Sequence, residues 1–191
     1  MRSRKLNEHE APLNVIDALT AAAVPYMLVG SYSSNFYGIP RSTADADFVI
    51  ALGEANISDV VQHLHPDLRL DPQTSFETVT GTIKNVLNLA SAEFTIELFR
   101  LSEDAHDQER FTRRVVRHLF ERDVYLPTAE DVIVTKLRWF RGKDRDDIAS
   151  VLAVQGDGLD FDYIHRWCEE HGTRTLLDEI RHALPPLDGL D

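Results

Sequence analysis

The sequence is poor in cysteine, with a single one at Cys168, so it cannot contain an internal disulfide. Cys168 lies in a stretch with helical spacing, where a buried structural thiol is the usual case, and we expect a cytoplasmic protein. No apolar run comes near the roughly 20 residues that cross a bilayer. The first residues lead into polar ones rather than into the apolar segment of a signal peptide, so we expect no leader and no membrane partner.

Positive charge is scarce as well. The chain has 20 Lys and Arg residues against 32 Asp and Glu residues, which gives a formal net charge of −12. Coating nucleic acid non-specifically requires neutralising many phosphates, so this balance argues against that class of protein. Short basic stretches at residues 2–5, 110–117 and 136–145 leave a guided contact with RNA open. Solvated surface faces are the simpler interpretation of these stretches.

What remains is an ordinary globular mixture, with 43% hydrophobic and 27% charged residues in a chain of 191. That length suits one core, or one core with a small helical unit. We expect a core at residues 1–127 and a C-terminal helical region at residues 128–191 packed on it. Glycines at positions 156 and 158 mark a seam between an α/β front and a helical tail.

Hydrophobic spacing predicts an α/β (α+β) fold, in which a mixed sheet of three to five strands is flanked by helices. The predicted β segments are residues 26–29, 45–50, 75–101 and 115–126, the last two as hairpins. The predicted helices are residues 10–23, 33–37, 57–64, 107–113, a helix capped by Thr128, and then 144–154, 161–171 and 175–184, the last ended by Pro185 and Pro186.

Two carboxylates stand two residues apart in the predicted strand 45–50. Side chains at this spacing point to the same face of a strand, so Asp45 and Asp47 project together while Ala46 and Phe48 face the core. Like charges so close raise each other's proton affinity. A divalent cation relieves this repulsion, and oxygen ligands beside a phosphate substrate favour magnesium.

A third acidic side chain, Glu97, lies on the polar face of the segment 94–99. If this strand lies beside the Asp45 strand, Glu97 completes a cluster of three carboxylates. Such a cluster can hold two magnesium ions and support displacement at the α-phosphorus of a nucleoside triphosphate.

Gly30 and Ser31 follow a buried strand and enter a helical turn. A glycine lets the backbone approach a phosphate, and a helix start presents unpaired amide donors to an anion. No Gly-Lys-Ser or Gly-Lys-Thr follows, so this is not the common phosphate-binding loop.

Taken together, these motifs resemble the DNA polymerase β-like nucleotidyltransferase superfamily. The residues that carry the resemblance are Val29-Gly30-Ser31 followed by Asp45-Ala46-Asp47-Phe48. The segment from Gly38 to Asp47 is similar to the Gly-x-x-Arg-x-Thr-x-Asp-x-Asp phrase of small bacterial members, among them the AbiEii-like toxins of toxin–antitoxin systems. Residues 127–137 and 141–148 are similar to a second phrase, and the resemblance covers about residues 26–152.

The resemblance implies a minimal nucleotidyltransferase that moves a nucleoside monophosphate from a triphosphate to an acceptor hydroxyl. The implied acceptor is RNA, with a tRNA end as the specific case, and an antitoxin protein is an implied partner. The residues that it assigns to catalysis and metal binding are Asp45, Asp47 and Glu97. Those assigned to the nucleotide are Gly30, Ser31, Arg41, Thr43 and Lys136, with Asp144 and Asp147 as secondary candidates.

Simpler roles compete with these assignments. Lys136 could equally be a surface lysine, and Arg41 and Thr43 could simply stabilise the loop before the strand. Asp144 and Asp147 share a helical face and would then hold Arg141 or Arg145.

Two other functions stay open. One is a catalytically idle relative that binds a nucleotide or a protein, because the superfamily usually has aspartate where Glu97 stands. The other is a sugar-nucleotide glycosyltransferase, which would require a long nucleotide-binding domain before Asp45, where 44 residues precede.

Overall fold

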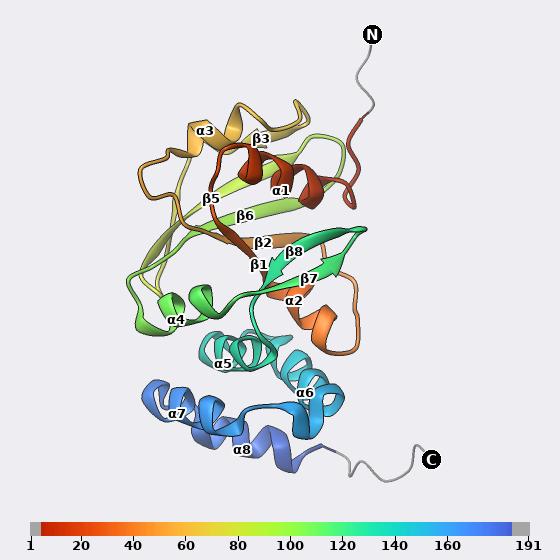
Figure 1. The fold of residues 1–191 in the computed structure, drawn as a ribbon. Coiled ribbons are helices and arrows are strands. Elements are labelled where there is room, and N and C mark those ends of the chain that lie inside the picture. Colours follow the sequence, from red (N-terminus) through yellow and green to blue (C-terminus); the bar gives the residue numbers. More distant parts are fainter. Residues whose placement is uncertain (1–4, 185–191) are drawn as a thin grey trace.

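The computed structural model describes residues 5–184 (Figure 1). The predicted end of the last helix at Pro185 and Pro186 lies outside these residues. Within them, no helix is both long enough and apolar enough to cross a membrane.

A mixed sheet occupies the upper half of the molecule in Figure 1. Its strand order is β1-β2-β6-β5-β3, with β4 paired to β5. Strands β2 and β6 are parallel, and the other pairs are antiparallel. The strands are β1 Tyr26–Val29, β2 Asp45–Ile50, β3 Leu68–Leu70, β4 Ser75–Glu77, β5 Thr82–Leu89 and β6 Thr95–Arg100.

This architecture confirms the predicted fold class, but the sheet has six strands where three to five were expected. Strand β3 was not predicted, since three residues are too few to show an alternating pattern.

The helices and the hairpin complete the chain. The helices are α1 Ala11–Ala21, α2 Gly30–Tyr37, α3 Ile57–Val61, α4 Ala105–Arg113, α5 Ala129–Trp139, α6 Asp144–Gln155, α7 Phe161–His171 and α8 Arg174–His182. The hairpin joins β7 Val115–Leu119 to β8 Arg122–Leu126, and a 3-10 turn covers Gly156–Gly158.

The largest differences between predicted and observed helix bounds are of three residues, at the second and third helices. The second helix begins at Gly30 rather than at residue 33, because Val29 is extended and Gly30 takes φ +63° as the chain turns into the helix. The third helix ends at Val61, three residues before the predicted end at residue 64. The N-cap at Thr128 is confirmed, since its hydroxyl oxygen accepts a hydrogen bond from the backbone N–H of Asp131.

The sheet has two different faces because side chains alternate along each strand. On one face, residues such as Leu28, Phe48 and Leu98 pack in a core with residues of α1 and α3. The other face carries a smaller cluster that includes Val49 and Phe99, and it looks toward α4 and α5. Polar groups can therefore gather on this second face without entering the main core.

The four C-terminal helices share one hydrophobic cluster, to which α2 contributes Tyr37. Helices before and after Gly156–Gly158 both belong to it, so the predicted seam at these glycines does not separate two packing units. The last two core residues of the hairpin, Val124 and Leu126, pack with the sheet instead. This distribution supports our proposal that the core covers residues 1–127 and the helical region residues 128–191.

A buried carboxylate ties α4, α5 and α7 together. Asp131 is 0% exposed and accepts a hydrogen bond of 2.5 Å from the hydroxyl of Tyr163. The ring of His106 lies 3.3 Å from the same carboxylate oxygen, and Thr128 donates to the other oxygen at 2.9 Å. Burial alone would raise the pKa of Asp131, but the hydrogen bonds from His106 and Tyr163 lower it. The charged form of Asp131 is therefore the one that the fold stabilises.

The variant Tyr163→Phe should lower the free energy of unfolding by about 1.5–3 kcal/mol, because it removes a buried hydrogen bond to a charged group. Urea denaturation followed by circular dichroism measures this. Tyr125→Phe, at an exposed site of the hairpin, is the matched control and should change stability by less than about 0.5 kcal/mol. Equal effects of the two variants would show that Asp131 does not depend on Tyr163.

Candidate active site

The predicted acidic residues lie side by side at one end of the sheet. Strands β2 and β6 run parallel in a register that places Asp45 beside Thr95 and Asp47 beside Glu97. Strand β1 pairs on the other side of β2, with Val29 opposite Asp47. All of these carboxylates are on the face that looks toward α5.

Asp47 is the most constrained of them. Its side chain is 9% exposed and stands over the first residue of α2. A Cβ atom at Gly30 would lie 2.0 Å from Oδ2 of Asp47, which no side chain could tolerate. Gly30 was predicted as a residue that lets the backbone approach a phosphate; here it makes room for the Asp47 carboxylate, and its positive φ favours glycine as well.

The surroundings of Asp47 disfavour its charge. Burial first, and then the carboxylates of Asp45 and Glu97, raise the pKa of Asp47 from 3.8 to about 7, while Arg141 and Lys84 act in the opposite direction. Asp45 and Glu97 are therefore each close enough to repel the charged form of Asp47. A cation beside Asp47 would relieve both the burial and the repulsion.

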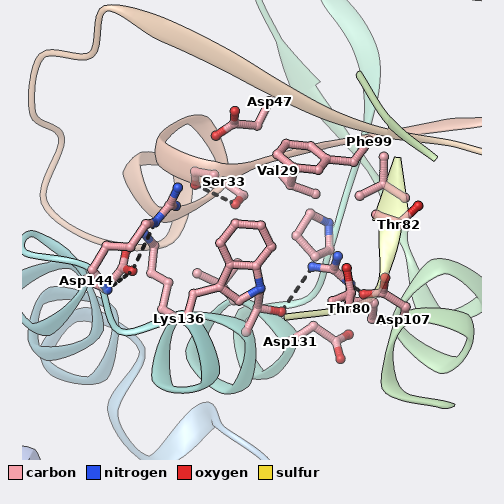
Figure 2. Close-up of a pocket in the computed structure, with 18 residues that line it drawn as sticks. Val29, Ser33, Asp47, Thr80, Thr82, Phe99, Asp107, Asp131, Lys136 and Asp144 are labelled. Atoms are coloured by element: carbon pink, nitrogen blue, oxygen red, sulfur yellow. Dashed lines mark hydrogen bonds and ion pairs between the residues drawn. The ribbon is translucent and has the colours of Figure 1, made fainter. Parts of the chain in front are cut away.

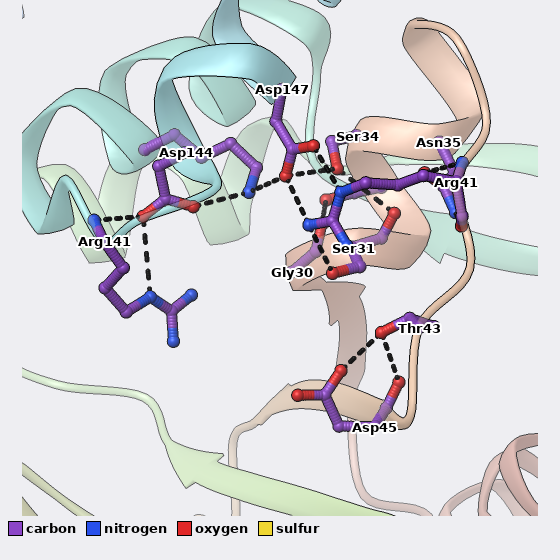
Figure 3. A network of polar contacts seen from close by, with 12 residues as sticks. Gly30, Ser31, Ser34, Asn35, Arg41, Thr43, Asp45, Arg141, Asp144 and Asp147 are labelled. Atoms are coloured by element: carbon purple, nitrogen blue, oxygen red, sulfur yellow. Dashed lines mark hydrogen bonds and ion pairs between the residues drawn. The ribbon is translucent and has the colours of Figure 1, made fainter.

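Asp45 is exposed at the start of β2. The hydroxyl of Thr43 donates to its Oδ1 at 2.5 Å, which fixes the carboxylate beside the loop (Figure 3). Thr43 thus contacts Asp45 itself, and its predicted contact with a nucleotide stays a prediction.

Glu97 is held by a residue that the sequence did not suggest. The ammonium of Lys84, on β5, donates to Oε1 of Glu97 at 2.6 Å. Within residues 5–184, no three acidic, histidine or cysteine side chains are grouped closely enough to hold a metal ion, and the predicted metal binding by the three carboxylates stays a prediction. The hairpin register is the signal that would have found Lys84, because Val86 lies opposite Glu97 and Lys84 is two residues along on the same face.

The residues of the loop and of α5 that were predicted to contact phosphate, Arg41 and Lys136, belong to one polar network (Figure 3). Arg41 donates to both oxygens of Asp147, at 2.7 and 2.8 Å, and to the hydroxyl of Ser31 at 3.1 Å. Lys136 is 6% exposed and donates to Asp144 at 2.9 Å and to Asp147 at 2.7 Å. Arg41 and Lys136 therefore have carboxylate partners from α6, and their contacts with a triphosphate stay predictions.

The surroundings of Asp147 stabilise its charged form. Burial raises its pKa, but the hydrogen bonds from Arg41 and Lys136 outweigh this and lower it to about 2. Asp144 accepts from the backbone N–H of Arg141 at 2.7 Å and lies 3.5 Å from its guanidinium. The alternative in which these aspartates hold arginines fits the structure, with Arg41 and Arg141 as partners rather than Arg145.

Two pockets meet beside Asp47. The first, which we call the polar cleft, runs along the loop before β2 and the start of α6. Its cationic side chains are Arg41, Lys136, Arg141 and Lys143. The second, the apolar pocket, lies between the sheet and helices α4 and α5 and spans about 640 Å³, part of which is open to solvent (Figure 2). Its walls include Val29, Val49, Phe99 and Trp139.

Asp47, Lys136, Arg141 and Asp144 line both pockets. A molecule in the polar cleft and one in the apolar pocket would thus meet at Asp47.

Arg141 is the other residue that sequence reasoning did not assign to the site. Its side chain is 58% exposed, it lies 4.9 Å from the Trp139 ring, and its charge acts on Asp47. It follows the left-handed residue Phe140 that ends α5, in the turn before α6. The sequence shows an arginine in a loop, and only the docking of the two helices brings it to the carboxylates.

The residues fit a divalent cation in part. Asp45 and the destabilised Asp47 form a hard oxygen pair of the kind that magnesium prefers. The third carboxylate is already neutralised by Lys84.

Residues 6–182 match the family described as nucleotidyltransferase of unknown function (DUF6036). No curated protein matches the chain closely enough to count as a relative.

Several solved structures are similar in fold. The antibiotic-resistance factor ANT(2'')-Ia superposes with a TM-score of 0.57 at 11% identity, over 90% of this chain and 95% of that one. A putative nucleotidyltransferase from H. pylori gives 0.54 at 17%, over 100% and 86%. The lincosamide antibiotic adenylyltransferase LnuA, solved with lincomycin bound, gives 0.51 at 12%, over 79% and 99%. At these identities the likeness shows the shared fold alone.

Because the pKa of Asp47 is raised, we expect Asp47→Asn to increase the free energy of unfolding by an amount that depends on pH. Because the folded protein keeps a proton on Asp47 up to about pH 7 while the unfolded chain loses it near 3.8, this group lowers stability as the pH rises through that window. Without divalent cations, Asp47→Asn should therefore be more stable than the wild type by about 1–4 kcal/mol near pH 8, and by much less near pH 4.5.

Urea denaturation at the two pH values with a chelator present measures the difference. Asp123→Asn, at an exposed position of the hairpin away from the site, is the control, since an exposed carboxylate there should contribute less than about 0.5 kcal/mol. A gain of the same size at both pH values would contradict the assignment of the effect to the charge of Asp47.

Proposed function

Since the chain belongs to the nucleotidyltransferase family DUF6036, we propose that it performs magnesium-dependent transfer of a nucleoside monophosphate to an acceptor hydroxyl, in the crevice where the two pockets meet. The observation that supports this site is the Asp47 carboxylate packed against Gly30 at the start of α2. It places an acidic pair next to backbone amides that suit a phosphate.

The nucleoside triphosphate would bind with its phosphates in the polar cleft. The first amides of α2 and the hydroxyl of Ser31 lie on one side, and the exposed guanidinium of Arg141 lies on the other. A planar guanidinium suits phosphate oxygens through paired hydrogen bonds. Lys136 would act indirectly, because its ion pairs hold Asp144 and Asp147 in place beside the cleft.

Asp45 and Asp47 are the residues that would hold magnesium, with Glu97 beside them as the third carboxylate. Magnesium in such a site supplies neutralisation of the charge that builds up on the phosphates. In the reaction the acceptor oxygen bonds to the α-phosphorus, the bond from the α-phosphorus to the pyrophosphate oxygen breaks, and the hydroxyl proton leaves toward the carboxylates. The protein would act mainly by positioning the two reactants.

The acceptor is a finer part of the proposal. The resemblance to AbiEii-like toxins implies RNA, for example a tRNA end, with an antitoxin as partner and the cytoplasm as location. The exposed Arg141 and Lys143 at the rim of the polar cleft support contact with a polyanion. The buried free thiol of Cys168 is consistent with a reducing compartment.

The idle relative is the second candidate, and the ion pairs of Lys136 and Lys84 are the observations that favour it. In that case the crevice binds a nucleotide without transferring it.

Transfer should depend on the acidic pair. With magnesium and each α-labelled triphosphate, the wild type should label an acceptor in total RNA. The double variant with Asp45→Asn and Asp47→Asn should transfer the label at a rate lower by about a hundredfold or more. Calorimetric titration of the triphosphates separates the candidates. Binding without transfer to any acceptor tried indicates the idle relative, and no binding with magnesium present would sink the proposal. Asp123→Asn, at an exposed hairpin site, is the control for surface charge.

Arg141→Met should weaken triphosphate binding by about tenfold, since it removes a charge-assisted contact and keeps the length of the side chain. Arg145→Met, at an exposed position of α6, is the matched control and should bind as the wild type does. Equal affinities of the two variants would remove Arg141 from the nucleotide site.

A further inference from the structure

The contact between Lys84 and Glu97 puts a permanent cation beside the acidic pair. The ammonium lies 2.6 Å from Oε1 of Glu97 and 5.4 Å from the centre of the Phe99 ring. An aromatic face attracts a cation, so two contacts hold the ammonium at this position. Both side chains of the pair remain about a quarter exposed, at 25% and 24%.

The strand register explains why these two residues meet. Glu97 of β6 lies opposite Val86, and Lys84 is its diagonal neighbour on β5. Diagonal neighbours on antiparallel strands lie about 7–8 Å apart, a span that long side chains bridge and short ones do not. Glutamate, with one methylene more than aspartate, suits this span.

The charges of the site balance with one divalent ion. On the sheet side of the crevice, Asp45, Asp47 and Glu97 carry three negative charges when ionised, and Lys84 carries one positive charge. The other cations of the crevice lie against Asp144 and Asp147 of α6; they are Arg41, Lys136 and Arg141. One magnesium ion adds two positive charges and neutralises the sheet-side group, whereas two ions would leave it positive before any substrate binds. The charge of Lys84 also reaches Asp47, whose pKa it lowers against the effect of the carboxylates.

We propose that the ammonium of Lys84 takes the place of a second divalent cation at Glu97, so that the free protein binds one ion, at Asp45 and Asp47. This rests on the proposed function, because it concerns the metal of the same site. Glu97 is then a carboxylate positioned by Lys84 rather than a ligand shared by two ions. Lys84 is a positioning residue, since it acts through Glu97.

Removing Lys84 should leave the fold intact, because a partly exposed ion pair contributes about 0–1 kcal/mol. The number of metal ions that each variant binds can therefore be measured on folded protein. Circular dichroism and the urea midpoint check that the variants are folded.

The experiment is a titration of the nucleotide-free protein with Mn²⁺, with the free ion followed by electron paramagnetic resonance. The wild type should bind one ion. Lys84→Met should bind two, because Glu97 is released, and Lys84→Arg should bind one, because the charge is kept. Lys5→Met, at an exposed position near the start of the described chain, should match the wild type.

Two ions in the wild type, no ion in the wild type, or one ion of unchanged affinity in Lys84→Met would each overturn the inference. Nucleotide transfer by a wild type that binds two ions would leave the proposed function standing and reject only the role of Lys84. A wild type that binds no triphosphate with magnesium present would instead reject the proposed function, whatever number of ions it binds.

Discussion

A carboxylate that is buried beside two others is the constraint on which the site depends. Asp47 can occupy its position only because Gly30 has no side chain, and it stays there at the cost of a pKa near 7. A fold driven by stability alone would have a neutral residue at this position. The cations around it, Arg141 and Lys84, compensate only in part, and this leaves a place that a metal and a phosphate can fill.

The parts of the molecule that depend on local periodicity could be predicted from the sequence. Strands β1 and β2 have the predicted bounds because they are buried runs with glycine or loop residues beside them. The period of two in β2 was enough to place Asp45 and Asp47 on one face. The cap at Thr128 was predictable for the same reason, since a capping side chain and its amide are three residues apart.

The partners of these residues could not be predicted, because they depend on how distant elements dock. Lys84 reaches Glu97 only in one hairpin register, and a slip of one residue would turn it to the core. Arg41 and Asp147 are 106 positions apart, and no local pattern joins them. Lys136 was therefore predicted as a triphosphate contact or as a surface lysine, whereas α6 covers it with two carboxylates.

The link between Arg41 and Asp147 also bears on how this protein can be altered or recombined. The loop before β2 takes its counterion from the helical region, and the hydroxyl of Tyr37 is bonded to the backbone of Pro127 where that region begins. Separation after residue 127 would leave Arg41 without its carboxylate partner, and Tyr37 without the hydrophobic neighbours of the helical region. An exchange of the helical region for that of another protein would therefore keep the loop before β2 in place only where the new region also supplies a carboxylate to Arg41.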